Sequence, residues 1–292
     1  MPHLSALQQV YHIKEILANT YQKGNKDWLF MKYHHSLDVL QLGEQLIETE
    51  PSLSVLDLSQ KQTLKMALLW HDIGRAFEKD EQGRIVPNFL HGAEGMHYLK
   101  SQLGIEDVAL LAAVMVHDRM DLNFLMLDCG DLATCPTMRF LSPEAKESVF
   151  MLNKAFHSLD ESEKSFVLKA VHLVKDADTL ANIQVFEKLI NYSKAPSKAF
   201  VTPAVFQSIN QLSYVDYQDI HSLADQGLVY FGWMYHFYFE ATRLLAKKHS
   251  FAEKIKTYVL SELKENKDTD HAALSLVEAQ YNKAISLLTS VN

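Results

Sequence analysis

Residues 59–74 read SQKQTLKMALLWHDIG, and this stretch indicates the fold of the chain. His71 continues the i, i+3, i+4 and i+7 spacing of the apolar residues before it, which places an imidazole on the buried stripe of an amphipathic helix. Asp72 follows directly, and Gly74 is expected to end the helix. A histidine–aspartate pair at the inner end of a helix is therefore the first candidate for a functional site.

The same period of about 3.6 residues recurs along most of the chain, and the alternation typical of strands is nearly absent. Glycine (10) and proline (7) are scarce among the 292 residues, which leaves few turns and favours helices. The predicted fold class is therefore all-α. The expected helices are 4–22, 34–49, 59–74, 91–103, 106–118, 143–157, 162–191, 203–213, 218–248, 251–265 and 270–290.

Breaks in this pattern predict the organisation of the chain. Segment 121–143 is the longest candidate loop. A second break, in the sequence NYSKAPSKAFVTP that begins at Asn191, separates a core from a C-terminal extension. We expect a core domain at 31–190, an N-terminal helix within 1–30 that packs on this core, and a C-terminal helical extension at 191–292 that also packs on it.

Composition excludes several classes of protein. The chain is 48% apolar and 22% charged, which is typical of a globular protein. Its net charge of −8 argues against nucleic acid as a partner. Two cysteines cannot form a disulfide framework, no apolar run is long enough to cross a membrane, and the N-terminal sequence lacks the features of a signal peptide. The expected location is the cytoplasm.

Other polar residues also fall on apolar helix faces. His35 shares a face with apolar residues, whereas its neighbour His34 lies among polar ones. His117 continues the apolar face of its helix. Asp178 lies between valines and an alanine on one face, whereas Asp176 shares its face with a lysine and a histidine. The pattern therefore predicts His35 and Asp178 as the inward members of these two pairs.

Burying imidazole and carboxylate groups is costly unless a partner compensates them. Any one of these histidines, taken alone, is explained by a hydrogen bond to a backbone carbonyl. Four helices that each present such a group inward favour a divalent metal, because imidazole nitrogen and carboxylate oxygen suit first-row metals.

The order of these residues, His35, then His71-Asp72, then Asp178, resembles that of the HD-domain metal-dependent phosphohydrolase superfamily. The resemblance covers about residues 31–190. It implies a helical HD-domain bundle and is carried by HHSLDVLQLGEQL (34–46), ALLWHDIGR (67–75) and KDADTLANI (175–183).

Two further motifs resemble those of HD proteins that hold two metals. They are HGAEGMHYL, which begins at His91, and VMVHDRM, which contains His117. The resemblance implies one or two divalent metals (Fe, Mn, Mg, Co, Ni or Zn) per chain. The first metal would take His35, His71, Asp72 and Asp178; the second would take His91 and His117, with Asp72 bridging.

This resemblance implies hydrolysis of a phosphate mono- or diester by a metal-bound hydroxide. Asp72 and Arg75 are the expected catalytic residues. Arg75, Arg119 and Lys175 are candidates for binding the substrate phosphate. Motifs of HD enzymes that act on guanosine tetraphosphate, cyclic dinucleotides or deoxynucleoside triphosphates are absent, which leaves a small phosphorylated metabolite or nucleotide as the expected partner.

Two other functions remain open at this point. Some HD-fold proteins are di-iron oxygenases with a similar ligand set, and others are non-catalytic nucleotide-binding or regulatory modules. The aromatic stretch LVYFGWMYHFYFEATRLLA (228–246) predicts a packed core or the face of a homo-oligomer, and alternatively a cap over the active site.

Overall fold

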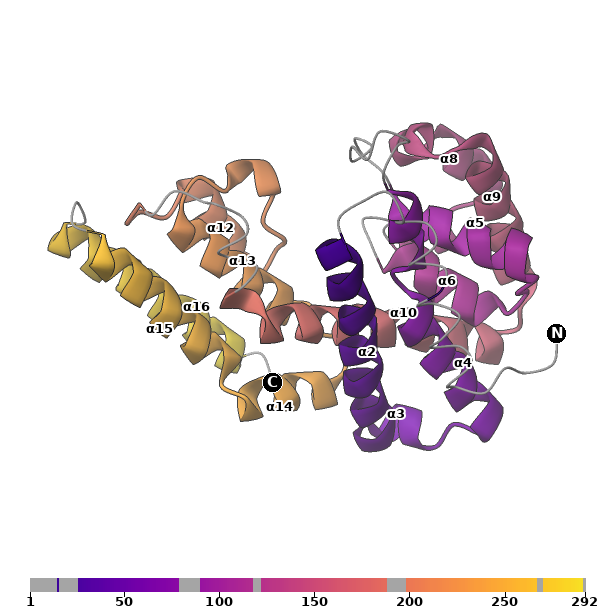
Figure 1. The fold of residues 1–292 in the computed structure, drawn as a ribbon, viewed down its shortest axis with the longest axis horizontal. Helices are drawn as coiled ribbons and strands as arrows, with labels where there is room; N and C mark the ends of the chain where they lie inside the picture. Colours follow the sequence, from indigo (N-terminus) through magenta and orange to yellow (C-terminus); the bar gives the residue numbers. More distant parts are fainter. Residues whose placement is uncertain are drawn as a thin grey trace. The chain divides into compact units, whose positions relative to one another are not determined.

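The computed structural model shows an all-α protein (Figure 1), which confirms the predicted fold class. No strand occurs in the parts of the chain that the structure describes, which are Glu15 and residues 26–78, 90–117, 122–187, 198–266 and 270–290. The chain divides into two compact units, Met1–Asp178 and Thr179–Asn292.

The first unit is a helical bundle that begins with three helices joined by short turns. Its elements are α2 (Lys26–Thr49), α3 (Pro51–Ser54), α4 (Leu58–Trp70), η1 (Ile73–Phe77), α5 (His91–Leu103), α6 (Val108–Val116), α7 (Asn123–Met126), α8 (Cys129–Thr134), η2 (Pro136–Phe140), α9 (Pro143–Ser158) and α10 (Glu161–Gln184), which continues into the second unit.

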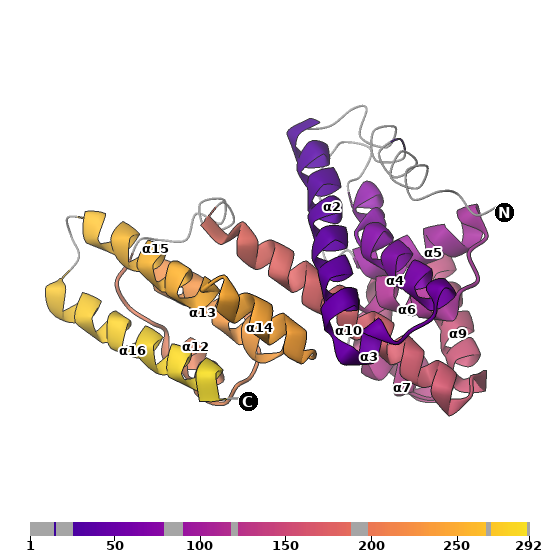
Figure 2. The same ribbon diagram turned by 90° about the horizontal axis from the view of Figure 1, so that it is seen from below.

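Helix α6 is the centre of this bundle. All of its residues after the first are buried, as expected for a helix that is apolar on every side. It packs against α4, α5 and α9, and α4 packs in turn against α2 (Figures 1 and 2). The polar residues at the ends of α4 and α6 are therefore held close to the middle of the unit.

Local sequence fixes where α4 and α6 begin. Asp57 and Gln60 form a capping box, in which each side chain accepts a hydrogen bond from the other's backbone N–H, at 2.8 and 3.2 Å. The carboxylate of Asp107 caps α6 by accepting from Leu110 N at 3.0 Å. These caps fix where each helix begins, and His71 and His117 directly follow the last residues of α4 and α6.

Two predictions about the first unit are wrong. The helix expected to reach Gly74 ends at Trp70, and Gly74 lies within η1 without a positive φ. Segment 121–143 is not a long irregular loop, because α7, α8 and η2 lie within its described part. These three elements have four to six residues each, which is too short for a helical period to appear in the sequence.

The second unit is also helical. Helices α13, α15 and α16 pack against one another, and α12 packs against α13 and α16 (Figure 2). The elements are α12 (Pro203–Asn210), η3 (Tyr217–Asp219), α13 (Leu223–Tyr235), α14 (Glu240–Lys248), α15 (Phe251–Glu265) and α16 (His271–Ser290).

The prediction of a single helix over 218–248 is also wrong, because α13 and α14 are separate helices. Between them, Phe237 and Phe239 are buried while Tyr238 is exposed, which is the alternation of an extended segment. Arg243 Nη2 donates a hydrogen bond to the backbone oxygen of Phe237 at 2.6 Å. This bond satisfies a carbonyl group that the interrupted helix leaves without a helical partner.

The helix predicted at 4–22 lies outside the described residues, apart from Glu15. None of the helices in the described part of the chain combines the length and the continuous apolar character that crossing a bilayer requires.

Candidate metal centre

The histidines and aspartates singled out in the sequence come together in the first unit. His35 lies on α2 and Asp178 on α10, while His71 and Asp72 follow the last residue of α4. His91 is the first residue of α5, and His117 follows the last residue of α6. Two groups of their ligand atoms each lie within 4.8 Å of one another: His35, His71 and Asp178, and His71, Asp72 and His117.

The first group joins α2 and α10 to the end of α4. His35 Nε2 lies 2.8 Å from Asp178 Oδ1. His71 Nε2 lies 3.7 Å from the same oxygen and 3.8 Å from Asp72 Oδ2. One carboxylate oxygen of Asp178 therefore faces two imidazole nitrogens.

Two further histidine nitrogens, those of His91 and His117, lie near the other oxygen of Asp72. Oδ1 lies 3.1 Å from His91 Nε2 and 3.5 Å from His117 Nε2, and these two nitrogens are 3.0 Å apart. Oδ2 instead faces His71 and, at 4.0 Å, His35 Nε2. The two oxygens of one carboxylate thus face two different pairs of histidines.

Backbone carbonyls fix the orientation of two of these rings. His71 Nδ1 donates to Leu68 O at 2.8 Å, and His117 Nδ1 donates to Val114 O at 2.6 Å. A carbonyl oxygen can only accept, so each Nδ1 carries a proton, and in the neutral imidazole each Nε2 then turns a lone pair toward the cluster.

The donor set fits a divalent metal. His71 is fully buried, and its Nε2 has no hydrogen-bond partner among the described residues. A buried lone pair without a donor is costly, and so are two Nε2 atoms 3.0 Å apart without a proton or cation beside them. Neutral imidazoles and ionised carboxylates are the ligands that first-row divalent metals take.

The pKa values of these groups favour the metal-binding protonation states. Burial lowers the pKa of His71 to about 3, although Asp72 and Asp178 act to raise it. Burial acts to raise the pKa of Asp72, but Lys32 and then Arg75 hold it well below its usual range. Burial also acts to raise the pKa of Asp178, but the hydrogen bond with His35 and the proximity of His35 and His71 together hold it below its usual range.

Comparison with known families agrees with this geometry. The HD domain family model matches residues 33–183. The chain belongs to the HD domain family. The HD domain places it in a superfamily of metal-dependent hydrolases that bind divalent metals. No curated protein and no solved structure matches the chain.

The cluster of His35, His71, Asp72, His91, His117 and Asp178, called the HD site below, has a cation beside it that the sequence analysis did not predict. Lys32 Nζ lies 2.9 Å from Asp72 Oδ2, and the lysine side chain is only 15% exposed. The signal was present in the sequence, because Lys32 precedes His35 by three residues and so lies on the same face of α2. Lysine usually lies at the surface, so its residue type does not by itself indicate a place in a buried site.

The structure places one of the three cations predicted to bind the substrate phosphate in contact with the HD site. Arg75 lies at the HD site, where its Nε is 3.4 Å from Asp72 Oδ1 and its Nη1 is 2.7 Å from Glu78 Oε1. Lys175 is half exposed on α10, three residues before Asp178. Arg119 lies outside the described residues.

The sequence predicted the inward member of two neighbouring pairs, His34 and His35 on α2 and Asp176 and Asp178 on α10, and the structure agrees with only one of these predictions. His34 is exposed and His35 half buried, which confirms the assignment on α2. The assignment of Asp176 to an outward face is wrong, because Asp176 is only 4% exposed. Its neighbours Val174 and Ala177 are fully buried, so α10 is covered on more than one side and a single apolar stripe does not describe it.

Proposed function

We propose that this chain is a metal-dependent phosphohydrolase that acts as a phosphomonoesterase or phosphodiesterase on a small phosphorylated metabolite or nucleotide. The observation that carries the proposal is the Asp72 carboxylate, whose two oxygens face separate histidine pairs. Lys32 and Arg75 lie at those same two oxygens. A potential bridging ligand flanked by two cations suits the binding of a phosphoryl group beside two metals.

The proposal assigns separate metal-binding and phosphate-binding roles to the residues of the site. His35, His71 and Asp178 would hold one metal, and His91 and His117 the other, with Asp72 bridging. When bound, such metals lower the pKa of a water and neutralise charge on the phosphoryl group. Lys32 and Arg75 would bind the remaining phosphate oxygens, because their nitrogens lie within 3.4 Å of the bridging carboxylate. Glu78 would orient the Arg75 guanidinium through its 2.7 Å contact.

The proposal is tested on the full chain without a tag, purified once in air and once anaerobically. Elemental analysis is expected to find about two metals per chain. The metal-loaded protein is expected to release phosphate from some member of a panel of sugar phosphates, nucleoside monophosphates and cyclic nucleotides, and chelator-treated protein is expected to release none. Oxygen consumption by the anaerobic iron form without phosphate release would contradict the proposal in favour of an oxygenase. Binding of nucleotides without any turnover would favour a regulatory module.

Lys32 gives a second, more local prediction. Lys32→Met keeps most of the apolar stem but removes the ammonium, so the KM for the phosphorylated substrate should rise roughly tenfold or more, as expected for one charge-assisted hydrogen bond. The metal content should stay unchanged. The matched control is Lys65→Met, since Lys65 pairs at 2.7 Å with Glu44 on α2 while both side chains are about 40% exposed. An unchanged KM together with a loss of metal would mean that Lys32 only positions Asp72.

A further inference from the structure

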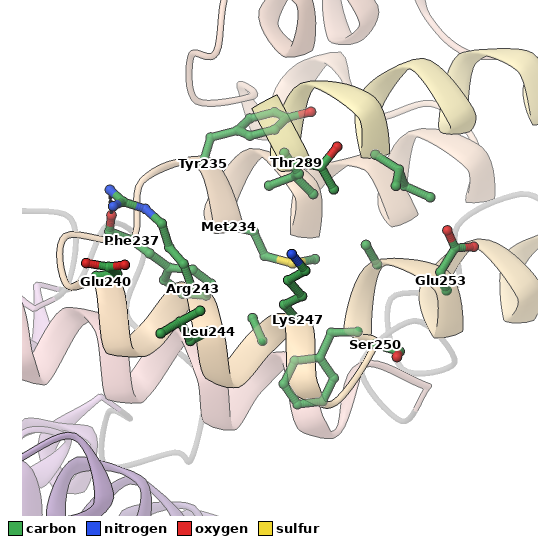
Figure 3. Close-up of a pocket in the computed structure, with 15 residues that line it drawn as sticks. Met234, Tyr235, Phe237, Glu240, Arg243, Leu244, Lys247, Ser250, Glu253 and Thr289 are labelled. Carbon is green, nitrogen blue, oxygen red and sulfur yellow. Dashed lines mark hydrogen bonds between the residues drawn. The ribbon is translucent and has the colours of Figure 1, made fainter. Parts of the chain in front are cut away.

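The second unit contains a cavity that the proposed phosphohydrolase activity does not use. Its volume is about 490 Å³, within the range of small-molecule sites. The C-terminal ends of α13 and α16, helix α14 and the first turn of α15 surround it (Figure 3). All the lining residues belong to the second unit, so the cavity can be considered by itself.

The walls of this cavity are apolar. Met234, Phe237 and Phe251 line it with side chains that are at most 5% exposed, and Leu288 closes it from α16. Tyr235 contributes its ring, because its hydroxyl already donates to Ala284 O at 2.9 Å. A ligand here would bury a hydrocarbon body.

Two cations one turn apart on α14 also line the cavity. Figure 3 shows the Lys247 side chain reaching into the space among these residues. Within the described residues, Lys247 makes no side-chain hydrogen bond and no ion pair. Arg243 has no carboxylate partner there either, and its Nη2 bond to Phe237 O leaves its other N–H groups available.

The start of α15 adds further hydrogen-bond donors. Ser250 precedes this helix with φ of +53°, and its side chain makes no capping hydrogen bond. The first backbone N–H groups of α15 therefore lack a side-chain acceptor. They lie at the same cavity as Lys247, since Ser250, Phe251 and Ala252 all line it.

Charge limits the ligand to a single negative group. Glu240 and Glu253 also line the cavity, so the four charged residues of its lining sum to zero. Glu253 lies 3.8 Å from Lys256. A monoanion can bind Lys247 and the α15 amides, whereas a dianion would meet two carboxylates at the rim.

We propose that this cavity binds a medium-chain carboxylate, with the hydrocarbon among Met234, Phe237 and Phe251 and the carboxylate at Lys247 and the first turn of α15. The proposal does not depend on the phosphohydrolase activity, because it concerns a different unit of the chain.

The test is calorimetric titration of the full chain with decanoate. Binding is expected for decanoate, and at least tenfold weaker binding for decanol, which lacks the charge, and for acetate, which lacks the chain. Decyl phosphate should also bind more weakly than decanoate. Equal binding of decanol, tighter binding of decyl phosphate, or no binding of decanoate would each overturn the proposal.

Variants locate the site. Lys247→Ala is expected to weaken decanoate binding at least tenfold, whereas Lys248→Ala, which changes the next exposed lysine outside the cavity, should leave it unchanged. Leu288→Trp should abolish binding by filling the space from α16. Circular dichroism checks that each variant is folded. Equal affinities in the two lysine variants, or full affinity in folded Leu288→Trp, would overturn the assignment.

Discussion

Asp72→Ala is expected to remove both metals and to lower phosphohydrolase activity by more than about 100-fold, since even partners of metal ligands typically contribute 10–100-fold. The reason is that each oxygen of this carboxylate faces a different histidine pair: His91 Nε2 lies 3.1 Å from Oδ1, and His71 Nε2 lies 3.8 Å from Oδ2. Helical content should change little, because the side chain contacts the polar centre rather than the apolar core. Elemental analysis, a phosphate-release assay and far-ultraviolet circular dichroism measure the three effects.

The control for this variant is His34→Ala. His34 is exposed on α2, beside His35, so its removal takes an imidazole from the neighbourhood without taking a lone pair from the cluster. Metal content and activity should both stay near the wild-type values. If Asp72→Ala kept one full metal equivalent, the carboxylate would not be a shared ligand. If His34→Ala lost metal, the assignment of faces on α2 would be wrong despite the observed exposure.

The sequence predicts the site best where one helix face is buried and the other is in water. This holds for His35 on α2 and for His71, which continues the apolar stripe of α4, whereas α6 is buried on every side and would bury His117 on any of its faces. A stripe assigns a side chain to the inside only if the opposite side of the helix is solvated. Helix α10 breaks this condition, since Leu173, Ala177 and Leu180 are all fully buried, and the pattern there misplaces Asp176.

Other features depend on contacts that a periodic pattern does not contain. The break between α13 and α14 lies in a continuous apolar and aromatic run, and it is accommodated by the bond from Arg243 to Phe237 O. The pairing of Lys32 with Asp72 joins residues 40 positions apart. Periodicity gives the face of a side chain but not its partner, so the sequence places Lys32 on the face of His35 without indicating its contact with Asp72.

Gly74 is another residue whose role depends on a contact that the periodic pattern does not contain. The sequence indicated a helix end, but the structure shows a close contact between backbones. A Cβ at Gly74 would lie inside the van der Waals distance of the backbone oxygen of His91 and 2.7 Å from Gly95 N. Both neighbours are backbone atoms of α5, so no side-chain rotation can make room.

Gly74→Ala is therefore expected to push the first turn of α5 away from η1. Overpacking costs typically 1–3 kcal/mol, and a clash with backbone should lie at the upper end, about 3 kcal/mol. For a unit of this size that lowers Tm by roughly 6–12 °C. Because His91 begins α5, the displacement should also cost the metal expected at His91 and His117, leaving about one metal per chain. Differential scanning calorimetry and elemental analysis measure the two effects.

Gly232→Ala is the matched control, since it makes the same chemical change in a buried part of α13. There a Cβ would have ordinary contacts, the nearest being Val215 Cγ2 at 3.7 Å. Alanine is also favoured over glycine in a helix by about 1 kcal/mol, so this variant should be neutral or slightly more stable. Equal losses of Tm in the two variants would mean that the added methyl, and not the contact with α5, causes the effect. A destabilised Gly74→Ala protein that still holds two metals would separate the packing of η1 on α5 from the placement of His91.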